Sequence, residues 1–124
     1  MKNENYMSNN EFNEFLHYDI GGLTNHFTET QVTDRGYFEI QNGWLGIVKR
    51  LISDLIEMGW DKRVCQVKEK FGGLEFYVDR VPEGVFDRIN EARKESHTVC
   101  EICGEPGELR TDRNWFKTLC DECK

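Results

Sequence analysis

The sequence predicts a small α+β fold: a helix–hairpin–helix core over residues 43–97, with an acidic segment before it and a cysteine-rich unit after it. Three observations support this prediction. Apolar residues recur at helical spacing after residue 43, two β-prone runs meet at a pair of glycines, and four of the five cysteines fall in the last 25 residues. With 124 residues, the chain can form one compact domain with small additions but not two large domains.

Residues 1–42 are expected to form an acidic N-terminal segment with one short helix. Ser8 and Glu11 have the spacing of a capping box, in which both side chains bond free N–H groups at a helix start. Apolar residues follow at helical spacing, so a helix is predicted near residues 9–18, before a glycine pair that ends it. In the remainder of the segment, only residues 37–40 have the composition of a short strand.

Two amphipathic helices are predicted in the core. The first lies near residues 44–58, where apolar and charged residues take opposite sides, and Gly59 ends it. Pro82 and Glu83 are expected to open the second, whose apolar stripe includes Phe86 and should cover the hairpin.

The hairpin is predicted from residues 64–71 and 74–78, which are rich in β-prone residues. Gly72 and Gly73 separate these runs and are typical of a two-residue turn with positive φ. In the resulting register, the residues expected in the core are Phe71, Leu74 and Phe76, and Lys70 is expected to pair with Glu75.

The C-terminal unit, residues 98–124, contains two Cys-x2-Cys pairs separated by 16 residues. This spacing is typical of structural zinc sites, because two tight knuckles can present four thiolates to one ion. The residues between the pairs can form a hairpin, which gives a zinc-ribbon-like layout. One structural Zn²⁺ is therefore predicted, with Cys100, Cys103, Cys120 and Cys123 as its ligands.

Disulfides, a redox dithiol and an iron–sulfur cluster are the alternatives to zinc. A secreted disulfide framework would call for a signal peptide, and the N-terminus has neither the basic start nor the apolar stretch of one. A redox Cys-x-x-Cys normally occurs once rather than as two matched pairs. Iron is the main remaining alternative. No apolar run is long enough to span a bilayer, and a cytoplasmic location is expected.

Two further residues of the hairpin could have a chemical role. Cys65 lies on the predicted apolar face and is expected to be a buried, unreactive core residue. Glu69 lies among apolar residues, where a carboxylate either pairs with an arginine or is kept for chemistry, and pairing is the more common role. The three histidines are scattered over three regions, so nothing supports a catalytic triad with Cys65.

The hairpin sequence KEKFGGLEFY, within residues 66–77, and the cysteine-containing runs 100–110 and 115–123 together resemble a known group. The group comprises short, uncharacterised bacterial and phage or prophage proteins with a KEKFGGL(R/E)FY hairpin and a C-terminal four-cysteine zinc finger. The resemblance covers about residues 43–123 and leaves out the acidic N-terminal segment. Glu75 stands where the group favours arginine. The resemblance implies a mobile-element setting and a zinc finger, but no activity.

Charge argues against a general affinity for nucleic acid. The chain has 16 basic and 23 acidic residues, a net charge of −7, and residues 1–42 alone contribute −5 with two basic and seven acidic residues. Four thiolates and one Zn²⁺ would add a further −2. Such a chain repels a phosphate backbone unless its basic residues are gathered on one face.

Three functions are compatible with the sequence. We expect a non-catalytic, zinc-stabilised protein-interaction module, in the setting of the resemblance an inhibitor of a host defence or nucleic-acid-handling protein. Its partner would have a basic surface, and the expected partner-binding residues are Glu11, Glu14 and Asp19. The alternative is a nucleic-acid-binding zinc ribbon that uses Arg110, Arg113, Trp115 and Lys117. An enzyme is the third and least favoured function, because no catalytic motif is found.

Overall fold

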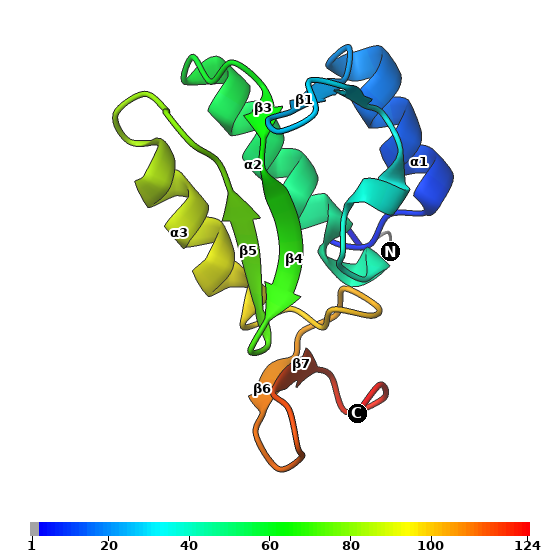
Figure 1. Ribbon diagram of the computed structural model, residues 1–124. Coiled ribbons are helices and arrows are strands. Elements are labelled where there is room, and N and C mark those ends of the chain that lie inside the picture. The colour runs from blue at the N-terminus through cyan, green and yellow to red at the C-terminus, as the bar shows by residue number, and fades with distance from the viewer. Residues whose placement is uncertain (1–2) are drawn as a thin grey trace.

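A computed structural model of the chain describes residues 3–124, so the first two residues of the predicted segment 1–42 lie outside the described residues. The fold is mixed α+β, as predicted, with three α-helices and three small sheets among the described residues. Figure 1 shows α2 (Leu45–Glu57) in the middle of the molecule, between α1 (Asn9–Glu14) and α3 (Val85–Ser96). No helix in the described part is both long and apolar enough to cross a membrane.

Helix α2 is the centre of the hydrophobic core and matches the helix predicted near residues 44–58. Its apolar side chains are fully buried, Leu51 and Leu55 among them, except for the partly buried Ile56. Phe12 and Phe38 belong to the same cluster of buried residues, and their rings lie edge to face with centroids 5.0 Å apart. The acidic N-terminal segment therefore shares one core with the residues that follow it.

Helix α1 begins as predicted, since Ser8 and Glu11 form both bonds of the capping box. The helix continues as a π-helical segment, Phe15–Asp19, and the chain then turns at Gly21 and Gly22, both with positive φ. The helix predicted near residues 9–18 is therefore present, with a wider last turn.

A small sheet follows that the sequence did not indicate. Strand β1 (Leu23–Asn25) pairs antiparallel with β2 (Gln31–Val32) and parallel with β3 (Arg63–Val64). Strands of two or three residues are too short to show an alternating pattern.

The strand expected at residues 37–40 is reduced to a single bridge between Glu39 and Lys68, after a 3-10 turn at Arg35–Tyr37. The Arg35 guanidinium donates to the carbonyl of Phe38 at 2.8 Å and also to the carbonyl of Ile40. Because these carbonyls are satisfied by a side chain, they need no neighbouring strand.

The hairpin consists of β4 (Gln66–Lys70) and β5 (Gly73–Tyr77), but its turn lies one residue earlier than predicted. Lys70 lies opposite Gly73, and Phe71 and Gly72 form the turn with φ of 52° and 82°. The predicted burial of Phe71 is wrong, because its side chain at the turn is 71% exposed.

The physical reason for this shift is that the second glycine serves packing. A Cβ at Gly73 would lie 2.6 Å from Nε2 of His97, directly after α3, so any other residue at that position would have to displace the imidazole ring. Leu74 and Phe76 are buried as predicted. The predicted pair of Lys70 with Glu75 does not form, and Glu75 instead lies 3.4 Å from Arg93 of α3.

Helix α3 starts at Val85 rather than at Pro82, because Gly84 at its N-cap has φ of 89°, outside the helical range. Val85 and Ala92 are buried against the core. Phe86, which was expected on the covered stripe, is 60% exposed.

The cysteine-rich unit contains the antiparallel strands β6 (Glu108–Arg110) and β7 (Lys117–Leu119) and lies at the turn of the hairpin (Figure 1). The Thr118 hydroxyl donates to the carbonyl of Gly72 at 2.6 Å. On the other side, the Trp44 indole donates to the carbonyl of Val99 at 2.8 Å. The unit is thus bonded both to the hairpin turn and to the start of α2.

Replacing Phe71 with asparagine is expected to raise the melting temperature. The change creates an Asn-Gly turn, which tolerates positive φ at both positions, and few contacts are lost because the ring is exposed. We expect a gain of about 1 kcal/mol in the free energy of unfolding, measured by thermal denaturation. Phe71→Val is the control and should lower stability, since β-branched residues resist positive φ. A lower melting temperature for Phe71→Asn would mean that the ring contributes more than the turn.

Candidate metal centre and contact surfaces

The four predicted ligand cysteines meet at one point. All four Sγ atoms lie within 4.8 Å of one another, and the sulfurs of Cys103 and Cys120 are 3.6 Å apart. Sulfurs bound to one tetrahedral zinc at about 2.3 Å lie about 3.8 Å from each other. The arrangement therefore fits a single metal ion such as zinc.

Each Cys-x2-Cys pair is shaped by backbone hydrogen bonds. Gly104, with φ of 82°, follows the first pair, and its N–H donates to the carbonyl of Cys100 at 2.9 Å. In the second pair, the N–H groups of Cys123 and Lys124 donate to the carbonyl of Cys120. These tight turns present both sulfurs of a pair to the same side, as the spacing predicted.

Backbone amides also favour the thiolate form of Cys100. Burial alone would raise the pKa of this thiol, but N–H groups of Cys103, Cys120 and Ile102 point at it and lower the pKa to about 7. The neighbouring Cys120 side chain raises the pKa of Cys123. Because a metal binds thiolates, uptake of an ion would displace the protons that the cluster otherwise shares.

A metal ion at this site would act as a cross-link. Four sulfurs complete a tetrahedral coordination shell, so no position remains for a water molecule or a substrate. The ion would add a bond between the chain after α3 and the chain after β7, which are also joined by the ladder of β6 and β7 and by the bond from the Glu101 N–H to the Thr118 carbonyl.

A partly buried ion cluster attaches the cysteine-rich unit to the hairpin. Lys117 Nζ lies 3.1 Å from Glu69 Oε1 and 3.7 Å from Glu101 Oε1. Glu101 is only 3% exposed, and its second oxygen accepts the N–H of Gln41 at 3.2 Å. Burial raises the pKa of Glu101, and the charge of Lys117 opposes that shift. Glu69 thus has a lysine partner, from a part of the chain that the sequence analysis did not connect with it.

The N-terminal segment reaches the first cysteine pair. The amide of Asn3 donates to the carbonyl of Cys103 at 3.1 Å, and the amide of Asn5 donates to the carbonyl of Gly104 at 3.3 Å. Arg50 of α2 holds Asn5 in place with a 2.8 Å bond to its side-chain oxygen. Sequence analysis missed these asparagines, since their partners are about 100 residues away in the chain.

The residues of the predicted nucleic-acid surface are largely engaged inside the protein. Arg110 donates to the carbonyl of Leu119 and lies 2.9 Å from Asp121. Lys117 belongs to the ion cluster with Glu69 and Glu101, and Arg113 lies 3.5 Å from an oxygen of Asp112. Trp115 is 62% exposed. These four residues therefore do not form a free basic surface.

The predicted partner-binding carboxylates lie together. Glu11, Glu14 and Asp19 line one surface hollow of about 260 Å³, formed by α1 and the π-helical segment. Tyr18, whose side chain is 76% exposed, and Lys49 line the same hollow. Glu11 also accepts the N–H of Ser8 at 3.2 Å, so it serves the helix cap as well.

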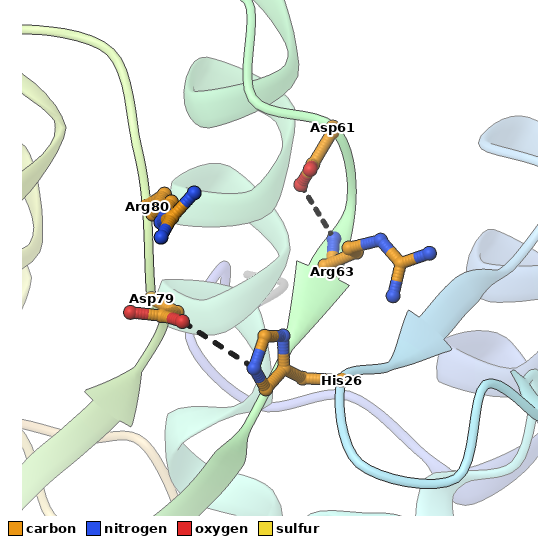
Figure 2. A pocket seen from close by; sticks show the side chains of 5 residues that line it. All are labelled: His26, Asp61, Arg63, Asp79 and Arg80. Atoms are coloured by element: carbon orange, nitrogen blue, oxygen red, sulfur yellow. Dashed lines mark hydrogen bonds and ion pairs between the residues drawn. The ribbon is translucent and has the colours of Figure 1, made fainter.

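A second hollow, of about 270 Å³, contains a histidine–aspartate pair that the sequence did not reveal (Figure 2). Nε2 of His26 lies 3.4 Å from Oδ2 of Asp79. Arg63 lines the hollow, but its guanidinium pairs with Glu29 at 3.1 Å. Arg80 and Asp61 complete the lining, so two acidic and two basic side chains balance each other. The hollow therefore has no strong preference for an anion or a cation.

Cys65 is half-buried rather than fully buried, and its backbone carbonyl accepts a hydrogen bond from the Tyr37 hydroxyl at 2.8 Å. Burial raises the pKa of the Cys65 thiol, and the charge of Asp79 adds to the effect. Both influences favour the protonated thiol, which is the unreactive form.

No family model, no curated protein and no solved structure matches the chain.

Purified protein is expected to contain one zinc per chain, because four thiolates that meet at one point bind zinc strongly. Cys103→Ser should lose most of this zinc and lower the melting temperature. Cys65→Ser is the matched control and should keep a full equivalent, since Cys65 lies outside the cluster. Elemental analysis of the three proteins measures the result. Well under one zinc in the wild type, or iron in its place, would contradict the prediction.

Lys117→Met is expected to destabilise the zinc-loaded protein by about 3 kcal/mol, because it leaves Glu69 and Glu101 facing each other without a cation. Thermal denaturation should show a decrease in melting temperature on the order of 10 °C. Lys124→Met removes an exposed lysine of the same unit and should have little effect. Adding Glu101→Gln to Lys117→Met should recover part of the loss, and no recovery would mean that repulsion between the carboxylates is not the cause.

Proposed function

We propose that this chain is a non-catalytic, zinc-stabilised protein-interaction module with a contact surface at Glu11, Glu14 and Asp19. The observation that carries the proposal is that these three carboxylates line a single hollow beside the exposed ring of Tyr18. Carboxylates next to an aromatic ring suit the lysine and arginine side chains of a basic protein surface.

Lys49 lines the hollow but forms no close ion pair with two of its carboxylates. Its Nζ lies 5.6 Å from the centroid of the Phe15 ring, and no ion pair within 4.0 Å joins it to Glu14 or Asp19 among the described residues. The two carboxylates are therefore not neutralised by this lysine at close range. The hollow also lies in the segment that carries most of the net negative charge of the chain.

We also propose that residues 98–124 form a zinc-ribbon-like unit. The pairing of β6 with β7 between two cysteine knuckles supports this. A zinc ion there would have a structural role, because four sulfurs leave no coordination position for substrate. The contact surface at α1 lies outside this unit and would depend on it through the contacts of Asn3 and Asn5.

The resemblance to phage and prophage proteins implies that the protein acts inside a bacterial host. The partner would then be a host defence or nucleic-acid-handling protein in the cytoplasm, and binding would inhibit it. Enzymes that handle nucleic acid carry basic surfaces, which an acidic protein can occupy.

Nucleic-acid binding remains the competing function. Trp115 offers one exposed ring for stacking on a base, and Arg113 is partly exposed. Arg110 and Lys117 would have to leave their internal partners to bind phosphate, which disfavours this function.

Neutralising the acidic hollow is expected to slow association with the partner. The partner is first identified by mass spectrometry after native pull-down from the host and then purified. Glu11→Gln, Glu14→Gln and Asp19→Asn are combined; glutamine at residue 11 can still close the capping box. We expect the association rate to fall about tenfold at low salt, with a smaller effect at high salt. The matched control combines Glu57→Gln, Glu83→Gln and Glu91→Gln, which are exposed acids elsewhere.

Equal association rates for the two triple variants would contradict the proposal. A mobility-shift assay on the wild-type protein at low salt tests the competing function. If the protein binds nucleic acid at micromolar concentration, and the double variant Arg113→Ala/Trp115→Ala does not, nucleic-acid recognition becomes the favoured function in place of protein interaction.

A further inference from the structure

A hollow of about 500 Å³ lies between the turn after β1 and the start of the hairpin. Its lining comes from four separate segments and consists of Phe27, Tyr37, Glu39, Cys65, Gln66 and Tyr77. Three of these six residues are aromatic, and only one of them carries a charge at neutral pH. Phe27 and Glu39 are both exposed, so a ligand could enter the hollow without displacing a helix or a strand.

Two of the three aromatic residues are positioned by contacts within the protein. The Tyr37 hydroxyl donates to the carbonyl of Cys65 at 2.8 Å, and the Tyr37 ring lies edge to face with that of Phe38 at a centroid distance of 5.5 Å. Tyr77 lies opposite Gln66 in the hairpin, and its carbonyl accepts the N–H of Cys65 at 2.9 Å. Because the Tyr37 hydroxyl already has a partner, this residue offers its ring to a ligand.

Phe27 is the most exposed aromatic residue of the hollow. Its N–H donates to the side-chain oxygen of Asn25 at 2.9 Å, which fixes the turn after β1. The Phe27 ring is 73% exposed and lies edge to face with His26, with the ring centroids 5.2 Å apart. Such a ring gains apolar burial when a ligand covers it.

Glu39 supplies the charge of the hollow, and its backbone is fixed at the edge of β4. Its N–H donates to the carbonyl of Val67 at 2.9 Å, and its carbonyl accepts the N–H of Glu69 at 3.2 Å. The side-chain amide of Gln66 donates to Oε1 of Glu39 at 3.2 Å. Among residues 3–124, no basic side chain forms an ion pair with this carboxylate, and its bridge partner Lys68 does not line the hollow. Oε2 of Glu39 is therefore available to a cation.

These groups together suit a guanidinium ion. Aromatic rings attract a cation through the negative faces of their π-systems. A guanidinium is planar, so it can lie flat on a ring while it donates hydrogen bonds to a carboxylate. The side-chain oxygen of Gln66 has no donor among the described residues and can accept a further N–H. The compact, strongly hydrated ammonium group of a lysine would use fewer of these groups.

We propose that this hollow, the arginine pocket, binds an arginine side chain of a protein partner. The guanidinium lies against the rings of Tyr37 and Tyr77 and donates to Glu39, and the alkyl part of the arginine packs on Phe27. The open form of the pocket favours a protein partner over a free guanidino compound, because small-molecule sites enclose most of their ligand. An arginine that projects from a protein surface is covered on its outer side by its own protein.

The test uses Nα-acetyl-arginine methylamide, an arginine side chain between two peptide bonds, added to the purified full chain labelled with ¹⁵N. We expect the amide signals of Phe27, Gln66 and Tyr77 to shift, with a dissociation constant of about 1 mM. The arginine pocket and the acidic hollow share no lining residue, so the signals of Glu14 and Asp19 report separately on the acidic hollow. Either site can therefore fail without the other.

Two variants and their matched controls test the assigned contacts. Glu39→Gln should weaken binding about fivefold or more, because it removes the charge but keeps an oxygen that can accept the bond from the neighbouring amide. Phe27→Ser should weaken binding about threefold. Neither variant should lower the melting temperature, since both side chains are exposed. Glu83→Gln and Phe86→Ser are the same changes at exposed residues elsewhere and should bind like the wild type.

Further ligands separate the parts of the recognition. The citrulline analogue has nearly the same shape but no charge and should bind at least about fivefold more weakly. The lysine analogue should also bind more weakly, and equal binding would overturn the assignment to arginine. An absence of shifts at about 50 mM ligand, or equal binding by Glu39→Gln or of the citrulline analogue, would overturn the proposal altogether. Butylguanidinium that binds at least about tenfold more tightly than the peptide-like ligand would assign the pocket to a free guanidino compound instead.

Discussion

The close approach of Gly43 to the first cysteine pair is the contact on which the arrangement of the molecule depends. Its N–H donates to the carbonyl of Glu101 at 2.7 Å, and a Cβ at this position would lie 2.2 Å from the carbonyl oxygen of Cys100. Only glycine therefore lets the start of α2 touch the metal-binding unit. With this contact in place, Trp44 can reach Val99 and Glu101 can lie beneath Lys117. The cysteine cluster is thereby connected directly to the start of the central helix.

Polar groups give this interface its specificity. Two apolar surfaces could shift relative to each other with little loss of energy. The buried carboxylate of Glu101, in contrast, has to contact the Gln41 N–H and the Lys117 ammonium group at the same time. Burial of a carboxylate is costly, and the cost is offset only in one relative position of the hairpin turn and β7. The same requirement determines where Thr118 meets Gly72. The relative position of the two parts of this interface is thus determined by specific hydrogen bonds and ion pairs rather than by apolar packing alone.

Local patterns predicted what depends on nearby residues. Helix α2, the capping box at Ser8 and the four ligand cysteines each follow from spacing within a short stretch. The hairpin register does not follow from local spacing, because two adjacent glycines allow two positions for the turn. The choice between them depends on the ring of His97, which is distant in sequence but adjacent in space. The roles of Lys117 and Arg110 were also hidden, since a basic residue in sequence does not reveal whether an acid lies beside it in space. Long-range partners account for the hairpin register and for the basic residues of the cysteine-rich unit, whereas the later start of α3 has a local cause in Gly84.

The bonds from Asn3 and Asn5 to the first cysteine pair have a consequence for the order of folding. They join residues about 100 positions apart, and contacts with such separation form late, after nearer elements have reduced the entropy of closing the loop. During synthesis the early segment would emerge long before its partners, leaving its amides to water until the last cysteines are made. Seating of the N-terminal segment on the first cysteine pair is then expected to be among the last steps of folding.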